Sequence, residues 1–261
     1  MKKIISAVAV LAGLAALSGC SHVPTGSLLD GVKPGPDGRI NVVTVFSHPD
    51  DETFYTGGTL IKMKKDPRVK LHIVCLTNGN MDEAKENLGI TKDQLGKFRK
   101  EELNLAGLVL GADSVVCLDY DDQGLEPADK GIMLGRVLDE INRNNAAIII
   151  THDPFGLSGH SDHIVCNDIT KKAFDESAAQ RLYYVTMTPC RYKYNMIFAL
   201  SDSKAEKSKP TIRVDISREK KLKKLALYSH VTQANFSFWN SIAMTEDLWY
   251  SYEYFTLAGQ K

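Results

Sequence analysis

The sequence predicts an α/β fold, a three-layer, Rossmann-like domain in which helices cover both faces of a mostly parallel sheet. Short runs rich in Val and Ile alternate along the chain with longer segments of helical periodicity. The short runs are apolar nearly throughout, as strands are when both faces of a parallel sheet are covered. With 261 residues, 43% hydrophobic and 25% charged, the chain can form one domain with a large core or at most two small ones.

Six apolar runs are predicted to be strands on their length and composition. In chain order they are INVVTVFS (40–47), VKLHIVCLT (69–77), SVVCLDY (114–120), AAIIITH (146–152), RLYYVTM (181–187) and TIRVDIS (211–217). Helices are predicted between them, at about 55–65, 93–109, 130–144, 162–177 and 218–229. The polar segment 201–210 is expected to be a solvated loop. The aromatic tail 236–259 is expected to pack over the sheet or beside the cleft.

The first 19 residues are typical of an export signal, because a short basic region (MKK) precedes the apolar stretch IISAVAVLAGLAAL. That stretch is shorter than the roughly 20 residues of a membrane-spanning helix. The following LSGC resembles the lipobox of bacterial lipoproteins, which implies cleavage before Cys20 and lipidation of Cys20. A plain anchor helix and a soluble signal peptide are the alternatives.

Residues 20–38 are rich in Pro, Gly and Ser. We expect them to be a flexible tether between a lipid anchor and a domain that spans residues 39–261. The predicted location is therefore the cell envelope, where the protein would be an exported lipoprotein. Ser21 after the lipidated cysteine favours the outer membrane, if the host has one.

Cysteine usage and charge narrow the classes of site and partner. Cys75 and Cys117 lie in strand-like runs and no CxxC pair is present, so we expect neither an essential disulfide nor a structural zinc site. The formal net charge is zero and no basic stripe is interleaved with aromatic residues. We therefore expect no nucleic-acid partner.

Two clusters of ionisable residues follow two different predicted strands. HPDDE (48–52) comes directly after the first strand, and THDPFGLSGHSDH (151–163) comes after the fourth. In the common strand order 3-2-1-4-5, the first and fourth strands are neighbours, and ligands bind beyond their carboxyl ends. The two clusters are therefore expected to meet at one crevice.

The residue types in these clusters indicate a catalytic metal site. Two His and one carboxylate are a common zinc set that leaves a fourth position for water. A divalent ion would also balance the negative charge of the acidic cluster, whose burial would otherwise be costly. A further carboxylate beside that water can accept its proton, and a further imidazole can stabilise or protonate what forms.

Taken together, the motifs resemble the PIG-L/LmbE-like family of zinc-dependent de-N-acetylases. SHPDDE (47–52) and HSDH (160–163) are similar to the family's (A/S)HPDDE and HxDH motifs. Four further segments fit in the same order, namely LTNG (76–79), RKEELNLAGLVLG (99–111), LDYDDQGL (118–125) and KKLALYSHVTQ, which ends at Gln233. The resemblance covers residues 40 to about 235.

The resemblance implies a metal-binding set and a base. His48, Asp51 and His163 would bind one zinc ion per chain. Asp50 would be the general base that acts on the water held by the metal. Ser161 stands where the family often has Pro, and the change is expected to be tolerated because its side chain has no role in the metal set.

Four more residues are given roles by the same resemblance. His160 would stabilise the oxyanion or serve as the general acid, with Asp162 tuning it. Arg99 and Asp122 would hold substrate hydroxyls or a charged group. The loop after the third strand departs from the family's usual Pro-Asp-Gly, so Asp121 is an alternative to Asp122.

Other polar residues in the motifs are expected to have supporting roles. His152 and Asp153 are expected to shape the loop after the fourth strand. Glu52 is expected to orient a ligand or to cap the following helix, and His230 and Gln233 are expected to support the wall of the zinc site.

The predicted function is that of a membrane-anchored, zinc-dependent hydrolase, a carbohydrate N-deacetylase. Its substrate would be an acetylated amino sugar, either an N-acetylglucosamine-type sugar or a glycoconjugate. A non-catalytic, solute-binding lipoprotein on the same fold and an amidase for a non-sugar conjugate are the alternatives. The complete acid–base set favours an enzyme, because a binding protein needs neither Asp50 nor His160.

Overall fold

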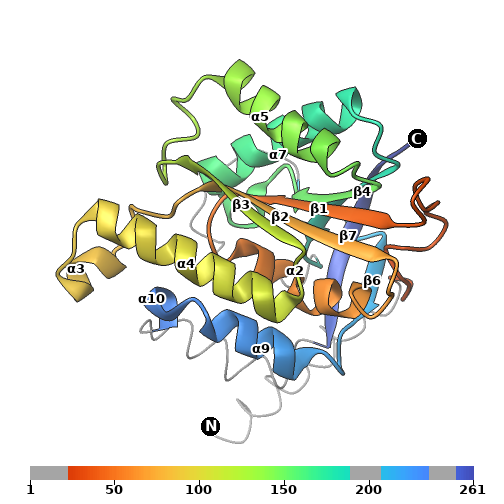
Figure 1. The fold of residues 1–261 in the computed structure, drawn as a ribbon, viewed down its shortest axis with the longest axis horizontal. Coiled ribbons are helices and arrows are strands. Elements are labelled where there is room, and N and C mark those ends of the chain that lie inside the picture. Colours follow the sequence, from red (N-terminus) through yellow and green to blue (C-terminus); the bar gives the residue numbers. More distant parts are fainter. Residues whose placement is uncertain (1–22, 189–206, 235–250) are drawn as a thin grey trace, which may run out of the picture.

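The computed structural model describes residues 23–188, 207–234 and 251–261. A seven-stranded sheet with the order β3-β2-β1-β4-β5-β7-β6 forms its centre (Figure 1). The strands are β1 (Ile40–Phe46), β2 (Val69–Thr77), β3 (Ser114–Tyr120), β4 (Ile148–His152), β5 (Arg181–Thr186), β6 (Ile212–Asp215) and β7 (Tyr252–Gln260). Strands β1 to β5 pair in parallel, and β7 runs antiparallel to both β5 and β6. The predicted α/β fold with a mostly parallel sheet is confirmed.

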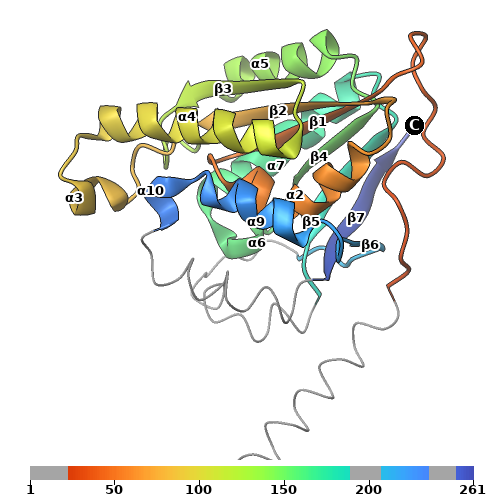
Figure 2. The same cartoon turned by 60° about the horizontal axis from the view of Figure 1, so that its bottom comes forward.

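Helices cover both faces of this sheet (Figures 1 and 2). They are α2 (Asp51–Met63), α3 (Ala84–Leu88), α4 (Lys92–Leu110), α5 (Lys130–Arg143), α6 (Gly156–Gly159), α7 (Ser161–Glu176), α9 (Lys220–Tyr228) and α10 (Val231–Ala234). One apolar core joins α2, α4 and α9 to one face of the sheet, and a second joins α5 and α7 to the other. Successive residues of β1 alternate between them, with Val42 in the first core and Val43 in the second. This double coverage explains why the strand is apolar along its whole length.

Strands β1 and β4 lie side by side, and residues 42–44 pair with residues 148–150. The two strands are not consecutive in the chain, so the direction of strand order reverses between them. From β1 the sheet continues to β2 and β3, whereas from β4 it continues to β5. The carboxyl ends of β1 and β4 are therefore neighbours at the edge where parallel α/β sheets bind ligands.

The aromatic tail contains a strand that we did not predict. β7 inserts between β5 and β6, and Tyr254 pairs with Thr186 on one side and with Arg213 on the other. Glu253, Tyr254 and Phe255 are all buried. Because three consecutive residues are buried, the segment lacks the alternation of apolar and polar residues that is typical of a strand. The sequence therefore predicted a segment that packs over the sheet and not a strand within it. The part of the tail at 235–250 lies outside the described residues.

The segment 23–38 is not the flexible tether that its composition predicted. Leu28 is fully buried within the first core, and Val32 lies in the same cluster. Backbone hydrogen bonds join Gly26 and Pro24 to Arg213 of β6 at 3.1 and 2.9 Å. The domain thus includes residues before position 39, because apolar side chains among the Pro, Gly and Ser residues anchor the segment.

Three expectations concern residues outside the described ranges. The signal peptide, the lipidated Cys20 and residues 201–206 of the predicted polar loop all lie there. Within the described ranges, Cys75, Cys117 and Cys166 carry free thiols. None of the helices in these ranges is both long enough and apolar enough to cross a bilayer.

Candidate active site

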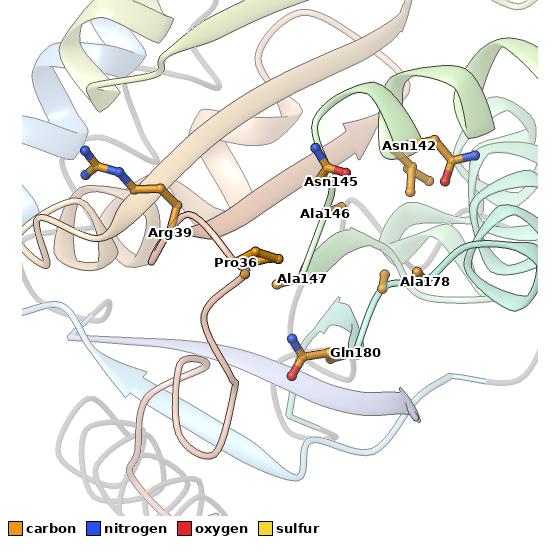
Figure 3. Close-up of a pocket in the computed structure, with 11 residues that line it drawn as sticks. Pro36, Arg39, Asn142, Asn145, Ala146, Ala147, Ala178 and Gln180 are labelled. Atoms are coloured by element: carbon orange, nitrogen blue, oxygen red, sulfur yellow. The ribbon is translucent and has the colours of Figure 1, made fainter.

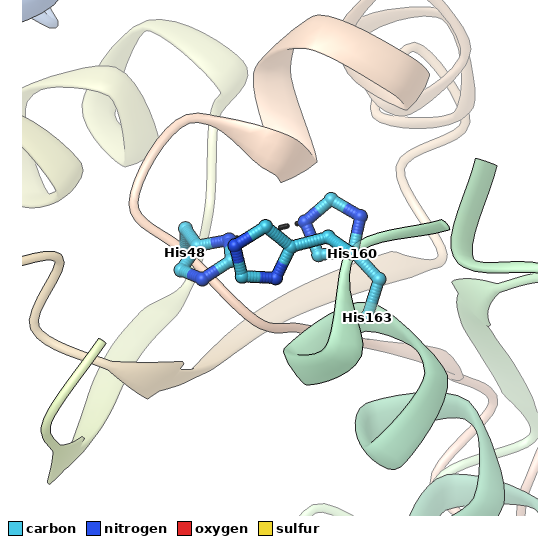
Figure 4. A group of neighbouring side chains, drawn as sticks. All are labelled: His48, His160 and His163. Atoms are coloured by element: carbon cyan, nitrogen blue, oxygen red, sulfur yellow. Dashed lines mark hydrogen bonds between the residues drawn. The ribbon is translucent and has the colours of Figure 1, made fainter. Parts of the chain in front are cut away.

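Both predicted clusters come together at the carboxyl ends of β1 and β4. His48 lies in the turn between β1 and α2, whereas His160 and His163 lie at the start of α7. Figure 4 shows the three imidazoles gathered between that turn and α7. The ring centroids of His48 and His163 are 5.0 Å apart, although the residues are 115 positions apart in the chain.

The three residues predicted to bind the metal form a compact triangle of ligand atoms. His48 Nδ1 lies 3.0 Å from His163 Nε2 and 3.5 Å from Asp51 Oδ2. The third edge, from His163 Nε2 to Asp51 Oδ2, is 3.4 Å. Ligands of tetrahedral zinc, with bonds of about 2.0–2.1 Å, lie about 3.3 Å from one another. The triangle therefore fits one zinc ion and leaves a fourth position open.

Hydrogen bonds on the far sides of both imidazoles fix which nitrogens face the triangle. His163 Nδ1 lies 2.9 Å from the carbonyl of Gly156, which only accepts, so Nδ1 carries the proton and the lone pair is on Nε2. His48 Nε2 lies 3.1 Å from Asp122 and 3.3 Å from Asp162. Such carboxylate and carbonyl partners are typical of metal-binding histidines, because they set the tautomer and the ring orientation.

Protonation of the cluster also matches a cation site. Burial tends to lower the pKa of His48, but hydrogen bonds to Asp122, Asp162 and Asp51 outweigh it and raise that pKa well above its usual value. Burial holds the pKa of His163 well below its usual value. The carboxylates around His48 therefore favour a positive charge at this point of the site, as they would favour a bound cation.

His152, the last residue of β4, belongs to this site and not to the loop that we expected it to shape. Its imidazole is fully buried, and Nε2 lies 3.3 Å from Asp51 Oδ2. Burial tends to raise the pKa of Asp51, but His163 and His152 together hold it well below the usual range. A metal-ligand atom from each of Asp51, His152 and His163 lies within 4.8 Å of the others. The position of His152 at the end of a central strand was the sequence signal that could have revealed it.

Asp50, the predicted base, is paired with an arginine. Its carboxylate accepts a hydrogen bond from Arg99 Nη2 at 2.9 Å. Burial raises the pKa of Asp50 to about 7, against the opposing charge of Arg99. A carboxylate with a pKa near neutrality can both accept a proton and release it again.

Arg99, predicted to contact substrate, binds the carboxylate of Asp50 in this structure. Its side chain is 3% exposed, and it donates to the carbonyls of Pro49 at 2.6 Å and Gly79 at 3.1 Å. Gly79 has φ +66°, and a Cβ there would lie 2.5 Å from Arg99 Nη1, so the guanidinium packs directly on that glycine. These contacts indicate that Arg99 positions the base, and contact with substrate stays a prediction.

The structure shows which of the two alternatives, Asp122 or Asp121, reaches the site. Asp122 is buried beside His48, which outweighs the effect of burial and lowers the pKa of Asp122 to about 2. Asp121 is exposed and bonds to Asn80 and Lys92 away from the cluster. Asp122 is thus the residue that reaches the site, and its contact here is with His48.

Asp162 connects the loop after β3 to the metal site. Its buried carboxylate accepts from the backbone N–H of Gln123 at 2.7 Å and of Leu125 at 3.2 Å. The contact between Asp162 and His160 is made by the backbone, because the N–H of Asp162 donates to His160 Nδ1 at 3.2 Å. Burial and the charge of His48 lower the pKa of His160, and the carboxylate of Asp162 opposes them only through its charge.

A separate cavity of about 170 Å³ lies among residues that precede β1, β4 and β5 (Figure 3). Arg39, Ala147 and Gln180, which line it, each come immediately before the first residue of a strand. This is the edge of the sheet opposite to the histidine cluster. Because ligands of α/β folds bind at the carboxyl ends of the strands, the cavity is not part of the candidate active site.

Known proteins with related sequences are deacetylases by name. A "1D-myo-inositol 2-acetamido-2-deoxy-alpha-D-glucopyranoside deacetylase 1" of Frankia casuarinae is 33% identical over 161 residues, which make up 52% of each chain. A "Probable N-acetyl-alpha-D-glucosaminyl L-malate deacetylase 2" of Bacillus anthracis is 30% identical over 195 residues, which cover 74% of this chain and 81% of that protein. The chain spans about half the length of the Frankia relative.

Comparison with a solved structure gives the fold, and comparison with a family model gives the family. The structure of N,N'-diacetylchitobiose deacetylase from Pyrococcus horikoshii matches with a TM-score of 0.62 over 87% of both chains, at 19% identity. At this level of identity the likeness shows the fold alone. The family model for GlcNAc-PI de-N-acetylase (PIG-L) matches residues 43–174, which are more than half of the chain and include both clusters of ionisable residues, 48–52 and 151–163. The chain therefore belongs to the GlcNAc-PI de-N-acetylase (PIG-L) family.

Proposed function

We propose that this protein is a zinc-dependent hydrolase that removes the N-acetyl group from an N-acetylglucosamine-type sugar or glycoconjugate. The observation that carries the proposal is the triangle of ligand atoms on His48, Asp51 and His163, whose edges of 3.0 to 3.5 Å suit tetrahedral zinc. The names of the two sequence relatives, both deacetylases of acetylated glucosamine compounds, support the sugar and the amide bond.

The chemistry divides between the metal and the side chains around it. When bound, zinc would lower the pKa of a water molecule and polarise the amide carbonyl of the substrate. Asp50 accepts the proton of the attacking water, because Arg99 fixes its carboxylate and its pKa lies near neutrality. His160, a partly buried imidazole set edge-on to His48 at 4.8 Å, donates a hydrogen bond to the oxygen that becomes negative. Asp50 then passes the proton that it accepted from the water to the leaving amine.

Acetate release measured together with metal content tests this proposal. A suitable panel contains N-acetylglucosamine, N,N'-diacetylchitobiose, inositol and malate glycosides of N-acetylglucosamine, and a non-sugar acetamide. We expect acetate from at least one sugar when the protein holds one zinc per chain, no acetate after chelation, and recovery on adding zinc. Full activity without metal, or no acetate from any sugar at stoichiometric zinc, would contradict the proposal. Hydrolysis of the non-sugar acetamide alone would indicate an amidase of another substrate class.

The second part of the proposal is that lipid on Cys20 holds the protein at a membrane of the cell envelope. Its support is the LSGC sequence after a short apolar stretch. Thr25 already pairs with Arg213 of the folded domain. The chain between the lipid and the domain can therefore span only roughly 17 Å, which keeps the domain close to the bilayer.

Fractionation of cells tests the anchor independently of the chemistry. We expect the wild-type protein in the membrane fraction with a lipid-modified N-terminus detected by mass spectrometry. Cys20→Ala should move the protein to the soluble fraction, because it removes the acyl chains that hold a protein on a bilayer. An unmodified Cys20 in a membrane-bound protein would exclude this mode of attachment.

A further inference from the structure

Asp50 has a backbone conformation that aspartate rarely adopts, with φ 134° and ψ −29°. Such a conformation costs free energy and persists only where surrounding contacts enforce it. The amide N–H of Asp50 donates to Glu52 Oε2 at 3.1 Å, and the carboxylate accepts from Arg99 at 2.9 Å. Glu52 therefore holds the backbone of the base, and Arg99 holds its side chain.

Glu52 is itself fixed by a residue from a distant part of the chain. Its side chain is 1% exposed, and Oε1 lies 3.2 Å from His230 Nε2 and 2.6 Å from Thr53 Oγ1. Because an ionised carboxylate only accepts hydrogen bonds, Nε2 of His230 is the donor. The other nitrogen, Nδ1, is buried and has no hydrogen-bond partner among the described residues. The side chain of His230 thus serves Glu52 rather than a metal.

The turn that carries His230 is fastened to helix α4. Thr232 donates to Glu102 twice, from its N–H at 2.7 Å and from Oγ1 at 2.8 Å. Glu102 lies one helical turn after Arg99, the residue that holds the carboxylate of Asp50. Helix α4 therefore supports the base by two routes, directly through Arg99 and indirectly through the turn of His230.

We propose that His230 is a positioning residue of the active site, which acts through Glu52 to hold the backbone of Asp50 in its left-handed conformation and so to aim the carboxylate of the base. The part of this inference that concerns catalysis rests on the proposed function. The part that concerns the conformation of Asp50 does not. It gives a specific task to the segment KKLALYSHVTQ, which the metal and substrate roles leave unexplained.

The test compares His230→Ala and His230→Gln with a matched histidine variant. His72→Ala is the control, because His72 bonds to Ser114 Oγ at 2.8 Å and has no contact with the site. In His230→Ala we expect the Asp50 amide to exchange with deuterium at least tenfold faster than in the wild type. We also expect kcat per zinc-loaded site to fall roughly 10- to 100-fold, with KM and zinc content unchanged, as for other partners that orient a site. His230→Gln should recover most of kcat, because its amide can still donate to Glu52, and His72→Ala should change none of these values.

A purely structural role for His230 would give a different result. Lower thermal stability with unchanged kcat and unchanged exchange at Asp50 would overturn the inference. If the wild type releases no acetate, the proposed function fails, whereas exchange at the Asp50 amide still decides the conformational role of His230. Should His230→Ala not fold, Glu52→Gln makes the same comparison, because a neutral amide oxygen is a weaker acceptor for the Asp50 N–H. Wild-type exchange and wild-type kcat in that variant would also overturn the inference.

Discussion

The imidazole of His152 stacks on that of His163, with ring centroids 4.0 Å apart and ring planes 9° apart. Its Nε2 lies 3.3 Å from Asp51 Oδ2 as well. His152 thus touches two of the three proposed zinc ligands without belonging to the triangle that they form. A residue in this position orients the ligands and excludes water from behind them.

Replacing His152 by Ala is expected to weaken zinc binding by roughly 10- to 100-fold, because Asp51 loses a hydrogen bond and His163 loses its stacking partner. Competition with a chromophoric chelator measures the affinity. His72→Ala provides the control, since that imidazole lies away from the site. Equal zinc affinity in the His152 variant and the wild type would refute an orienting role.

Separate variants of the base and of a ligand should have different effects. Asp50→Asn is expected to retain zinc and to lose activity by roughly 10²- to 10⁴-fold, because an amide cannot accept the proton. His163→Ala should lose zinc itself, because one corner of the triangle is missing. Elemental analysis and acetate release on the same samples distinguish the two cases. Wild-type turnover by Asp50→Asn would exclude this residue as the base.

A buried ion pair fixes β7 to the helices beneath it. Glu253 lies 3.0 Å from Lys223 of α9 and accepts from the backbone N–H groups of residues 58 and 59 in α2 at 3.0 and 2.7 Å. Glu253→Gln removes the negative charge while the lysine stays buried. We expect the free energy of unfolding to fall by about 3 kcal/mol, measured by urea denaturation.

An exposed ion pair is the control for that measurement. Lys172 and Asp168 lie 2.7 Å apart on α7, with more than half of each side chain exposed. Asp168→Asn should lower the free energy of unfolding by at most about 0.5 kcal/mol. A similar loss in both variants would show that burial does not strengthen the pair of Glu253.

The stability of the domain should depend on pH through Asp113. Partial burial tends to raise its pKa, but hydrogen bonds from Lys64, Lys70 and the N–H of Leu71 hold that pKa well below its usual range. A lowered pKa in the folded state means that the stabilisation is present above the unfolded value, about 3.9, and is lost as the pH falls towards the folded value. Asp113→Asn should therefore destabilise the protein by about 1 kcal/mol at neutral pH.

Urea denaturation over a range of pH checks this dependence on Asp113. The difference in stability between the wild type and Asp113→Asn should narrow as the pH drops below about 4, because the unfolded wild type then binds a proton at Asp113 that the folded state, with its lower pKa, does not. Asp139→Asn, at an exposed position on α5, should show no such trend. A difference that stays constant with pH would contradict the role of Asp113.

The meeting of the two clusters could be predicted because their residues lie where the sequence marks the boundaries of elements, whereas the choice of three metal ligands among them came from the resemblance to the PIG-L/LmbE-like family. His48 and Asp51 flank the junction of β1 and α2, and His163 lies in the first turn of α7. Apolar runs define the ends of parallel strands, and strand order then brings those ends together. The contact between Glu52 and His230 joins residues 178 positions apart. A pattern within one segment cannot reveal a contact between residues so far apart in the sequence, so only the folded structure shows it.

Side-chain direction accounts for the other differences between sequence and structure. The sequence predicted contact of Arg99 with substrate, which stays a prediction, but it did not reveal that the guanidinium binds Asp50, because the helical pattern of α4 does not specify this partner. Leu28 was overlooked because the composition of the segment around it is typical of a linker, although one buried leucine suffices to fix the chain. Pattern and composition thus locate elements well, but they do not determine which partner a side chain reaches.

Within the described part of the sheet, β6 is joined to the other strands through β7 alone. Without β7, strand β5 would present a row of unpaired N–H and C=O groups to solvent. Bare edges of this kind pair with strands of neighbouring molecules. The inserted strand β7 therefore covers the edge of β5 and protects the parallel part of the sheet from self-association. A chain truncated before Tyr252 would be prone to aggregate, even though it would still contain all the residues of the histidine cluster.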